Sequence, residues 1–331
     1  MVSGTPEPPP ARVAFFGTPA FAVPALEQLV RSHHRVVGVV TQPDRPSGRG
    51  QRRAEGPVKQ AALAHGLPVL QPDRLQAPDV LEAFRAWQAD IGVVAAYGRI
   101  LPPALLDLPR FGMVNIHASL LPKYRGAAPI QRAVVAGEIE TGVTIMRLVP
   151  ELDAGPLLAA RAAPIGPDET SEALERDLAV LGATLLASTL DDIVAGRAVE
   201  TPQDPARATY APRLAKSEGL IDWAHPARQI HNLIRGLHPW PHAFTYLDGV
   251  RCVILTSRLL AGRQSADESP APAPGEVREA SGDRLIVQCG GGDVLSIVEL
   301  QREGRRVQTA REFVSGRGAR RGQMFGPPAS P

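Results

Sequence analysis

The chain of 331 residues contains only two cysteines, Cys252 and Cys289, and they lack any metal-ligand spacing. This scarcity argues against a disulfide-stabilised secreted scaffold and against a cysteine-based zinc site. No apolar run approaches the roughly 20 residues that cross a bilayer, and residues 1–11 have neither the basic start nor the apolar stretch of a secretion signal. We therefore expect a soluble, cytoplasmic protein that contacts no membrane and begins with a disordered tail at residues 1–11.

The net charge of +2 is small, but it is unevenly distributed. Residues 201–331 contain 17 Lys and Arg against 13 Asp and Glu, a surplus of +4, which leaves 19 against 21, or −2, for the first 200 residues. The surplus is concentrated in residues 301–322, which hold seven Arg and two Glu. A basic segment of this kind favours a polyanionic partner.

Two domains are the default for this length. Short apolar runs at 12–16, 36–40, 91–95, 113–116 and 143–149 alternate with helical patterns, which predicts a mostly parallel sheet covered on both faces. Past residue 216 the pattern changes to a hairpin around Asp248-Gly249 and further short strands, which predicts a small β-barrel. We predict an α/β, Rossmann-like domain at 12–196, a proline-containing linker at 197–215 and the barrel domain at 216–331.

Polar side chains gather where two predicted strands end. Asn115 and His117 are two positions apart, so they share one face of their strand, and Asp153 follows the strand at 143–149 in a short turn. The Asn amide can stabilise a developing oxyanion, the imidazole can donate a hydrogen bond or move a proton, and the carboxylate can orient the imidazole or receive the proton. This combination suits acyl transfer to an amine without a covalent enzyme intermediate.

Several alternatives remain open at this stage. A lone histidine at a strand end is often structural, and Ser119 could be considered a nucleophile, although it lacks the G-x-S-x-G elbow. The first strand ends in Gly17-Thr18-Pro19, which does not have the glycine spacing of a dinucleotide site.

Beyond these residues, long strings of the chain resemble the methionyl-tRNA formyltransferase family, over about residues 12–313. The matching strings include F-F-G-T-P-A-F-A at 15–22, V-V-A-A-Y-G-R-I-L-P at 93–102, N-I-H-A-S-L-L-P-K-Y-R-G from 115, T-G-V-T-I-M at 141–146 and L-D-A-G at 152–155. Within them, S-L-L-P-K-Y-R-G is similar to a 10-formyltetrahydrofolate motif that several folate-dependent formyltransferases share.

The resemblance implies a reaction: transfer of the formyl group of 10-formyltetrahydrofolate to the amino group of methionyl initiator tRNA, without a metal, by an enzyme we expect to be monomeric. It implies that the barrel is an OB-like tRNA-binding domain and that Asn115, His117 and Asp153 are catalytic. The folate-binding residues would be Ser119, Leu120, Leu121, Pro122, Lys123, Tyr124, Arg125, Gly126, Tyr97, Ile100 and Leu101. The tRNA-binding residues would be Arg45, Arg49, Arg52 and Arg53 in a basic loop and Arg302, Arg305 and Arg306 near the C-terminus. The chain departs from the family at Pro156, where relatives often have an acid.

Two rival functions remain. A folate-dependent formyltransferase that acts on a sugar-nucleotide amine or on glycinamide ribonucleotide would share the folate loop and the three catalytic residues. A non-catalytic RNA-binding relative would keep the fold and lose those residues.

Overall fold

The structure is a computed structural model that describes residues 9–47, 52–260 and 272–327. Residues 1–8 of the predicted tail and Arg49 lie outside this range, as do the side chains of Arg45, Arg52 and Arg53. The chain forms two compact units. Unit 1 contains the residues up to Pro129 together with Glu140–Pro164 and Glu175–Ala211, and unit 2 contains Ile130–Ile139, Ile165–Leu174 and the residues from Pro212 onward. The predicted boundaries at 196 and 216 stay a prediction.

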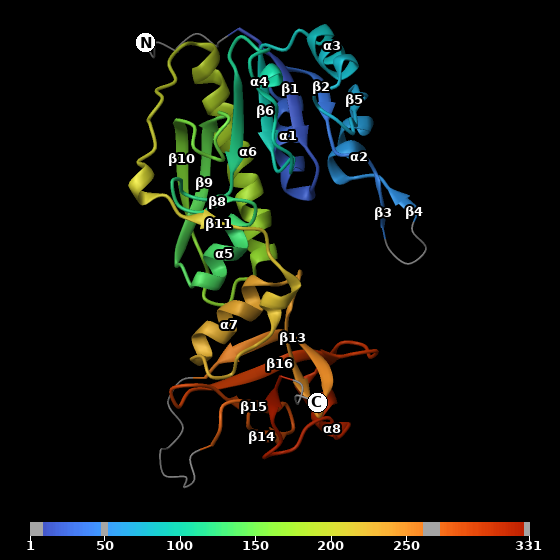
Figure 1. Cartoon of the computed structure of the whole chain (residues 1–331), viewed down its shortest axis with the longest axis vertical. Coiled ribbons are helices and arrows are strands. Elements are labelled where there is room, and N and C mark those ends of the chain that lie inside the picture. Colours follow the sequence, from blue (N-terminus) through green and yellow to red (C-terminus); the bar gives the residue numbers. More distant parts are fainter. Residues whose placement is uncertain (1–8, 48–51, 261–271, 328–331) are drawn as a thin grey trace, which may run out of the picture. The chain divides into compact units, whose positions relative to one another are not determined.

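A seven-stranded sheet forms the centre of unit 1 (Figure 1). In spatial order its strands are β10 (Leu157–Pro164), β9 (Glu140–Arg147), β7 (Met113–His117), β6 (Ile91–Ala95), β1 (Arg12–Gly17), β2 (Arg35–Val40) and β5 (Val69–Leu70). The strands from β7 to β5 are parallel, and β9 runs antiparallel to both β7 and β10. The predicted Rossmann-like, mostly parallel sheet is confirmed, whereas strand β10 was not predicted.

Helices α1 (Val23–Arg31), α2 (Pro57–Ala64), α3 (Pro78–Ala86) and α4 (Pro103–Leu106) connect the parallel strands. Each has a proline in its first two positions, where the fixed φ suits a helix and the missing N–H has no helical partner to lose. A single 3-10 turn, η1 (Ala20–Ala22), precedes α1, and the long helix α6 (Ser171–Val194) follows β10.

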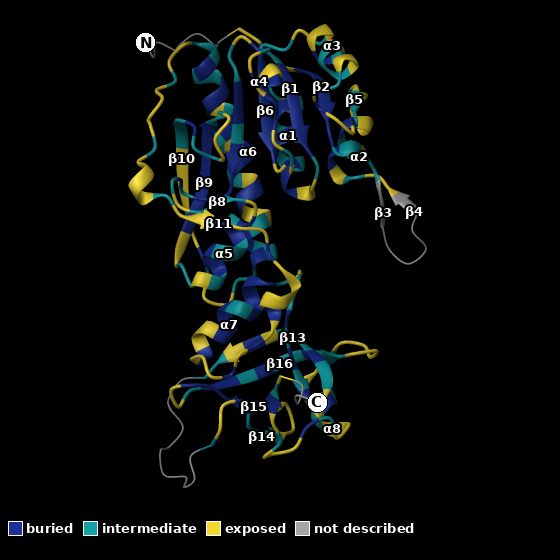
Figure 2. Cartoon of the chain, in the orientation of Figure 1, coloured by how far each residue is buried: buried dark blue, intermediate teal, exposed yellow. Residues whose placement is uncertain are grey.

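The two faces of the sheet are covered differently. On one face, Phe16 and Tyr97 lie in an apolar cluster with Phe84 of α3. On the other face α6 packs closely, because a Cβ at Gly182 would lie 2.8 Å from Cγ2 of Ile116. Figure 2 shows the central strands as buried, in dark blue. Since side chains alternate along β7, the α6 side takes Ile116 and leaves Asn115 and His117 on the opposite face.

Two short strand pairs and a further 3-10 turn complete unit 1. Strands β3 (Arg45–Ser47) and β4 (Arg52–Ala54) form an antiparallel hairpin within the predicted basic loop. Strand β8 (Arg125–Gly126) pairs in parallel with β11 (Tyr210–Ala211), and β11 follows η2 (Pro205–Arg207) in the segment predicted as a linker.

Unit 2 is built on an antiparallel sheet, which confirms the predicted OB-like class. Its strands are β12 (Ala243–Leu247), β13 (Val250–Leu259), β14 (Val277–Ser281), β15 (Arg284–Gln288), β16 (Val294–Arg302), β17 (Gln308–Thr309) and β18 (Phe325–Gly326). The hairpin turn between β12 and β13 has φ values of 51° at Asp248 and 75° at Gly249. Two positive φ values are what a type I′ turn requires, so the predicted turn is confirmed.

Among the described helical elements of unit 2, the sequence pattern predicted the first and missed the other three. They are α5 (Pro129–Ala136), η3 (Lys216–Gly219), α7 (Ala227–Gly236) and α8 (Ala310–Ser315). Helix α7 packs against β13, and its Ile230 and Ile234 belong to the apolar core of this unit. Its apolar residues recur at helical spacing, so the sequence itself contained the signal for this helix.

Candidate active site

Two polar side chains of strand β7 lie on the face of the sheet opposite α6. Asn115 is half-buried and His117 is buried, and both lie at the carboxyl end of a parallel strand, where open α/β sheets bind their ligands. The prediction that they share a face is therefore consistent with the observed strand β7.

The ring of His117 has a defined tautomer. Its Nε2 lies 2.9 Å from the carbonyl oxygen of Tyr124, and a carbonyl can only accept, so Nε2 is the nitrogen that carries the proton. In the neutral ring Nδ1 is then a bare acceptor. It lies 3.7 Å from Oδ2 of Asp153. A proton taken up at Nδ1 would create an imidazolium facing a carboxylate.

Asp153 reaches this position from a turn after β9. Its backbone has φ of 48°, a left-handed conformation that is uncommon for residues other than glycine. Its Oδ2 accepts a hydrogen bond of 2.8 Å from the backbone N–H of Gly126. Only 11% of the side chain is exposed. The carboxylate is thus held between the strand-end histidine and the loop at 119–126.

The amide of Asn115 differs from its neighbours because it has no hydrogen-bond partner within the described ranges. It is also not fully buried, so solvent or a ligand can reach it. Two amide N–H donors on a rigid strand are therefore available to an oxygen of a bound molecule.

Hydrogen bonds within the loop and from strand β9 stabilise the predicted folate loop at 119–126. The Ser119 hydroxyl is fully buried and donates to the carbonyl of Lys123 at 2.7 Å, so it is not exposed as a nucleophile. The Thr144 hydroxyl donates to the Ser119 carbonyl at 2.7 Å. Gly126 has φ of 120°, and a Cβ there would lie 2.8 Å from the carbonyl oxygen of Ala211. Only glycine fits this position.

The second predicted folate segment presents one side chain to solvent. The ring of Tyr97 is buried, and its centroid lies 5.7 Å from that of Phe16. Its hydroxyl has no partner in the described structure, and burial raises the pKa of Tyr97. Leu101 is also buried, whereas 83% of Ile100 is exposed. Between described residues, no side-chain hydrogen bond joins Tyr97, Ile100 or Leu101 to His117 or Asp153.

The basic loop is held at both ends by one lysine that the sequence analysis missed. Nζ of Lys59 lies 2.5 Å from Oδ2 of Asp44, just before β3, and 3.1 Å from Oε1 of Glu55, just after β4. These two contacts raise the pKa of Lys59. The lysine lies in helix α2, where the sequence contains no recognisable motif, so nothing in the sequence pointed to it.

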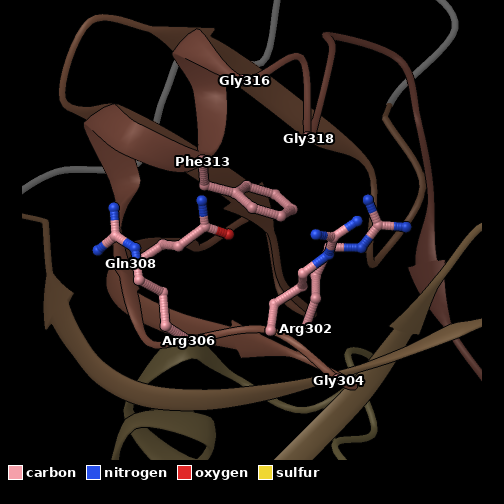
Figure 3. A pocket seen from close by; sticks show the side chains of 8 residues that line it. Arg302, Gly304, Arg306, Gln308, Phe313, Gly316 and Gly318 are labelled. Carbon is pink, nitrogen blue, oxygen red and sulfur yellow. The ribbon is translucent and has the colours of Figure 1, made fainter.

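Three predicted tRNA-binding arginines surround one hollow in unit 2. The hollow has a volume of about 550 Å³ and is lined by Arg302, Arg305, Arg306, Gln308, Phe313 and glycines 304, 316 and 318. In Figure 3 the side chains of Arg302 and Arg306 stand on opposite sides of it, with the ring of Phe313 between and above them. Arg306 pairs with Glu312 at 2.8 Å, whereas Arg302 and Arg305 have no acidic partner among the described side chains. The hollow is therefore strongly cationic.

One cluster of side chains in unit 1 is spaced as metal ligands are, but one of its histidines is in a tautomer that cannot bind a metal. Ligand atoms of His33, His34 and Asp191 lie within 4.8 Å of one another. Nδ1 of His34 accepts a hydrogen bond of 3.1 Å from the N–H of Ala11, so its Nε2 carries the ring proton and faces Asp191 at 3.2 Å. A protonated nitrogen cannot bind a metal, and we assign this cluster a structural role.

Proteins of known family resemble this chain over most of its length. Residues 11–190 match the family described as formyl transferase, and residues 213–318 match the formyl transferase C-terminal domain. The methionyl-tRNA formyltransferase of Solibacter usitatus is 48% identical over 305 residues, covering 92% of this chain and 95% of the relative. That of Geotalea uraniireducens is 44% identical over 315 residues, covering 95% of this chain and 98% of the relative.

Solved structures agree on the fold. An N-formyltransferase from Helicobacter canadensis, in complex with folinic acid and dTDP-3-aminofucose, is 18% identical with a TM-score of 0.65, covering 88% of this chain and 99% of that one. In the described ranges no helix is both long and apolar enough to cross a bilayer. The family matches confirm the predicted class of enzyme, one that transfers a formyl group. The chain belongs to the methionyl-tRNA formyltransferase family.

Proposed function

We propose that this enzyme moves the formyl group of 10-formyltetrahydrofolate to the α-amino group of methionyl initiator tRNA. The observation that carries the proposal is the contact between Nδ1 of His117 and the carboxylate of Asp153, beside an Asn115 amide without a partner in the described structure. An acyl transfer to an amine needs a proton acceptor and an oxyanion donor, and these side chains supply both.

The proton follows a path that the tautomer of His117 defines. An α-amino group titrates near 7.7 to 8.0, so a modest base suffices to keep it neutral and nucleophilic. Nδ1 of His117 accepts the proton that the attacking amine loses and returns it to the departing nitrogen of the donor. One carbon–nitrogen bond forms and one breaks, so no proton is lost or gained overall. Asp153 stabilises the transient imidazolium across 3.7 Å.

Asn115 acts on the formyl oxygen in this proposal. As the amine attacks, negative charge develops on that oxygen, and the free amide N–H groups donate to it. 10-Formyltetrahydrofolate supplies an activated formyl group when bound. The unpartnered amide of Asn115, the self-supporting loop at 119–126 and the exposed side chain of Ile100 fit such a donor.

Two basic regions support tRNA as the acceptor. The hairpin β3–β4 contains Arg45, Arg52 and Arg53, and Arg49 lies between its two strands in the sequence. The hollow in unit 2 contains three further arginines. Clustered guanidinium groups bind the phosphate groups of RNA through charge-assisted, often bidentate hydrogen bonds. We further propose that the enzyme works as a monomer in the cytoplasm, where initiator tRNA is charged.

A sugar-nucleotide amine or glycinamide ribonucleotide would be the alternative acceptor. The Helicobacter canadensis enzyme, whose complex holds an amino sugar nucleotide, shares the fold with this chain. The three arginines around one hollow favour RNA, because a single small amine gives no reason for a cationic site in unit 2.

The proposal is tested with the purified chain, 10-formyltetrahydrofolate and methionyl initiator tRNA. Parallel reactions contain uncharged tRNA or a sugar-nucleotide amine in place of the aminoacyl-tRNA. Formyl-methionyl-tRNA should form only in the first mixture. Folate turnover on the small amine alone would keep the chemistry and reject the tRNA acceptor, and tRNA binding without any turnover would indicate a non-catalytic relative.

A further inference from the structure

Gln203 lies in the segment predicted as a linker, yet its side chain is tied to the Asp153 turn. Its Nε2 donates to the carbonyl oxygen of Asp153 and to that of Gly155, both at 2.8 Å. Its Oε1 accepts from Nε and Nη2 of Arg125 at 3.1 and 2.7 Å. A glutamine has two N–H donors and two acceptor lone pairs, so every hydrogen-bonding position of this side chain is used.

The turn needs this support because its backbone is unusual at two positions. Asp153 has φ of 48°, which is unfavourable for a residue with a Cβ. A Cβ at Gly155 would lie 1.9 Å from the carbonyl oxygen of Arg147, so this position tolerates only glycine. One amide that bonds the carbonyl groups of residues 153 and 155 fixes their relative orientation. It thereby fixes the direction in which the Asp153 side chain leaves the backbone.

Gln203 also controls the other side of the Asp153 carboxylate. Arg125 is buried and has no acidic partner in the part of the chain that the structure describes, and its guanidinium is held by Gln203. The next residue, Gly126, donates its N–H to Oδ2 of Asp153. Gln203 therefore closes a ring of hydrogen bonds that contains the turn, the carboxylate and the loop.

We propose that Gln203 is a positioning residue that sets the Asp153 carboxylate against Nδ1 of His117. It touches neither His117 nor a reacting atom, and it acts through Asp153. The inference rests on the proposed roles of His117 and Asp153 and assigns Gln203 to the same reaction.

The test variant is Gln203→Glu. The new carboxylate keeps the acceptor for Arg125 and loses both donors, so the carbonyl groups of residues 153 and 155 lose their partner. We expect kcat to fall about 10- to 100-fold, the range that misplacement of a catalytic group by an ångström costs. KM for the folate donor and for the tRNA should change less than about twofold, because the residues that bind both substrates are unchanged. Gln323→Met is the matched control, since Gln323 bonds Asp248 in unit 2, and it should retain the wild-type kcat.

A double-mutant cycle separates positioning from general destabilisation. Once Asp153 has been changed to Asn, Gln203→Glu should reduce kcat by less than about twofold further, since it has no carboxylate left to position. Losses that multiply in the double variant would show that Gln203 acts by another route and would overturn the proposal.

A second readout does not depend on turnover. The ¹⁵N chemical shift of Nδ1 of His117, assigned with a His117→Gln variant, reports the contact of the ring with the carboxylate. It should move in Gln203→Glu in the same direction as in Asp153→Asn. An unchanged shift in Gln203→Glu would refute the positioning role, even if the wild-type chain formylates a different acceptor. A wild-type chain that formylates no acceptor would refute only the proposed function.

Discussion

Replacing Asn115 by alanine should separate catalysis from folding. The Asn115 amide has no hydrogen-bond partner in the described ranges, so its removal leaves no protein donor or acceptor unsatisfied. The melting temperature should therefore stay close to that of wild type, because such substitutions usually change stability by about 0.5 kcal/mol or less. Loss of one oxyanion donor should lower kcat by about 10² to 10³, or about 3 to 4 kcal/mol of transition-state stabilisation.

The assay is single-turnover formylation of methionyl initiator tRNA, run beside thermal unfolding of the same preparations. Asn115→Asp keeps the shape of the side chain but places negative charge where the formyl oxygen becomes negative, so its rate should be lower still. Asn232→Ala is the matched control, because Oδ1 of Asn232 accepts from the buried Arg235 at 2.9 Å. It should lose about 1.5 to 3 kcal/mol of stability and keep its rate.

Two outcomes would refute this reasoning. A kcat of Asn115→Ala within about threefold of wild type would mean that the amide donates nothing to the transition state. A raised KM for the folate donor with an unchanged kcat would instead place Asn115 in ground-state binding.

Two further predictions concern unit 2. Alanine replacement of each arginine of the hollow should reduce the slope of log binding constant against log salt by about 0.7 to 0.9 for every tRNA phosphate that the arginine neutralises. Arg284→Ala is the control, because Arg284 does not line the hollow and pairs with Glu279 at 2.7 Å. Identical slopes in all these proteins would remove the hollow from the tRNA interface. Burial raises the pKa of Cys252 to about 11 and that of Cys289 to about 12, so both remain protonated thiols at about pH 8. Iodoacetamide should label neither in the native protein and both after denaturation, as counted by mass spectrometry, and rapid labelling of the native chain would contradict the burial.

Local patterns of the sequence were sufficient for much of the fold. The apolar runs at 91–95 and 113–116 became β6 and β7, with the second extended by one residue to His117. The Asp248-Gly249 pair predicted its turn because few other residues accept two positive φ values in succession. Strand β10 escaped prediction because it lies at the sheet edge with half its residues exposed, so its apolar pattern is weak.

The sequence by itself determined that Asn115 and His117 share a face, because alternation along a strand is a property of the backbone alone. Its motifs also determined the family, which the relatives confirm. Only the tertiary structure brought Asp153 to 3.7 Å from His117, and only it buried the Ser119 hydroxyl against a carbonyl. It also placed Gln203 on the Asp153 turn, 50 positions along the chain. No repeating pattern in the sequence predicts these contacts, because most of them join segments that are far apart in the chain. They form only when the sheet, the loop at 119–126 and the segment that contains Gln203 pack together.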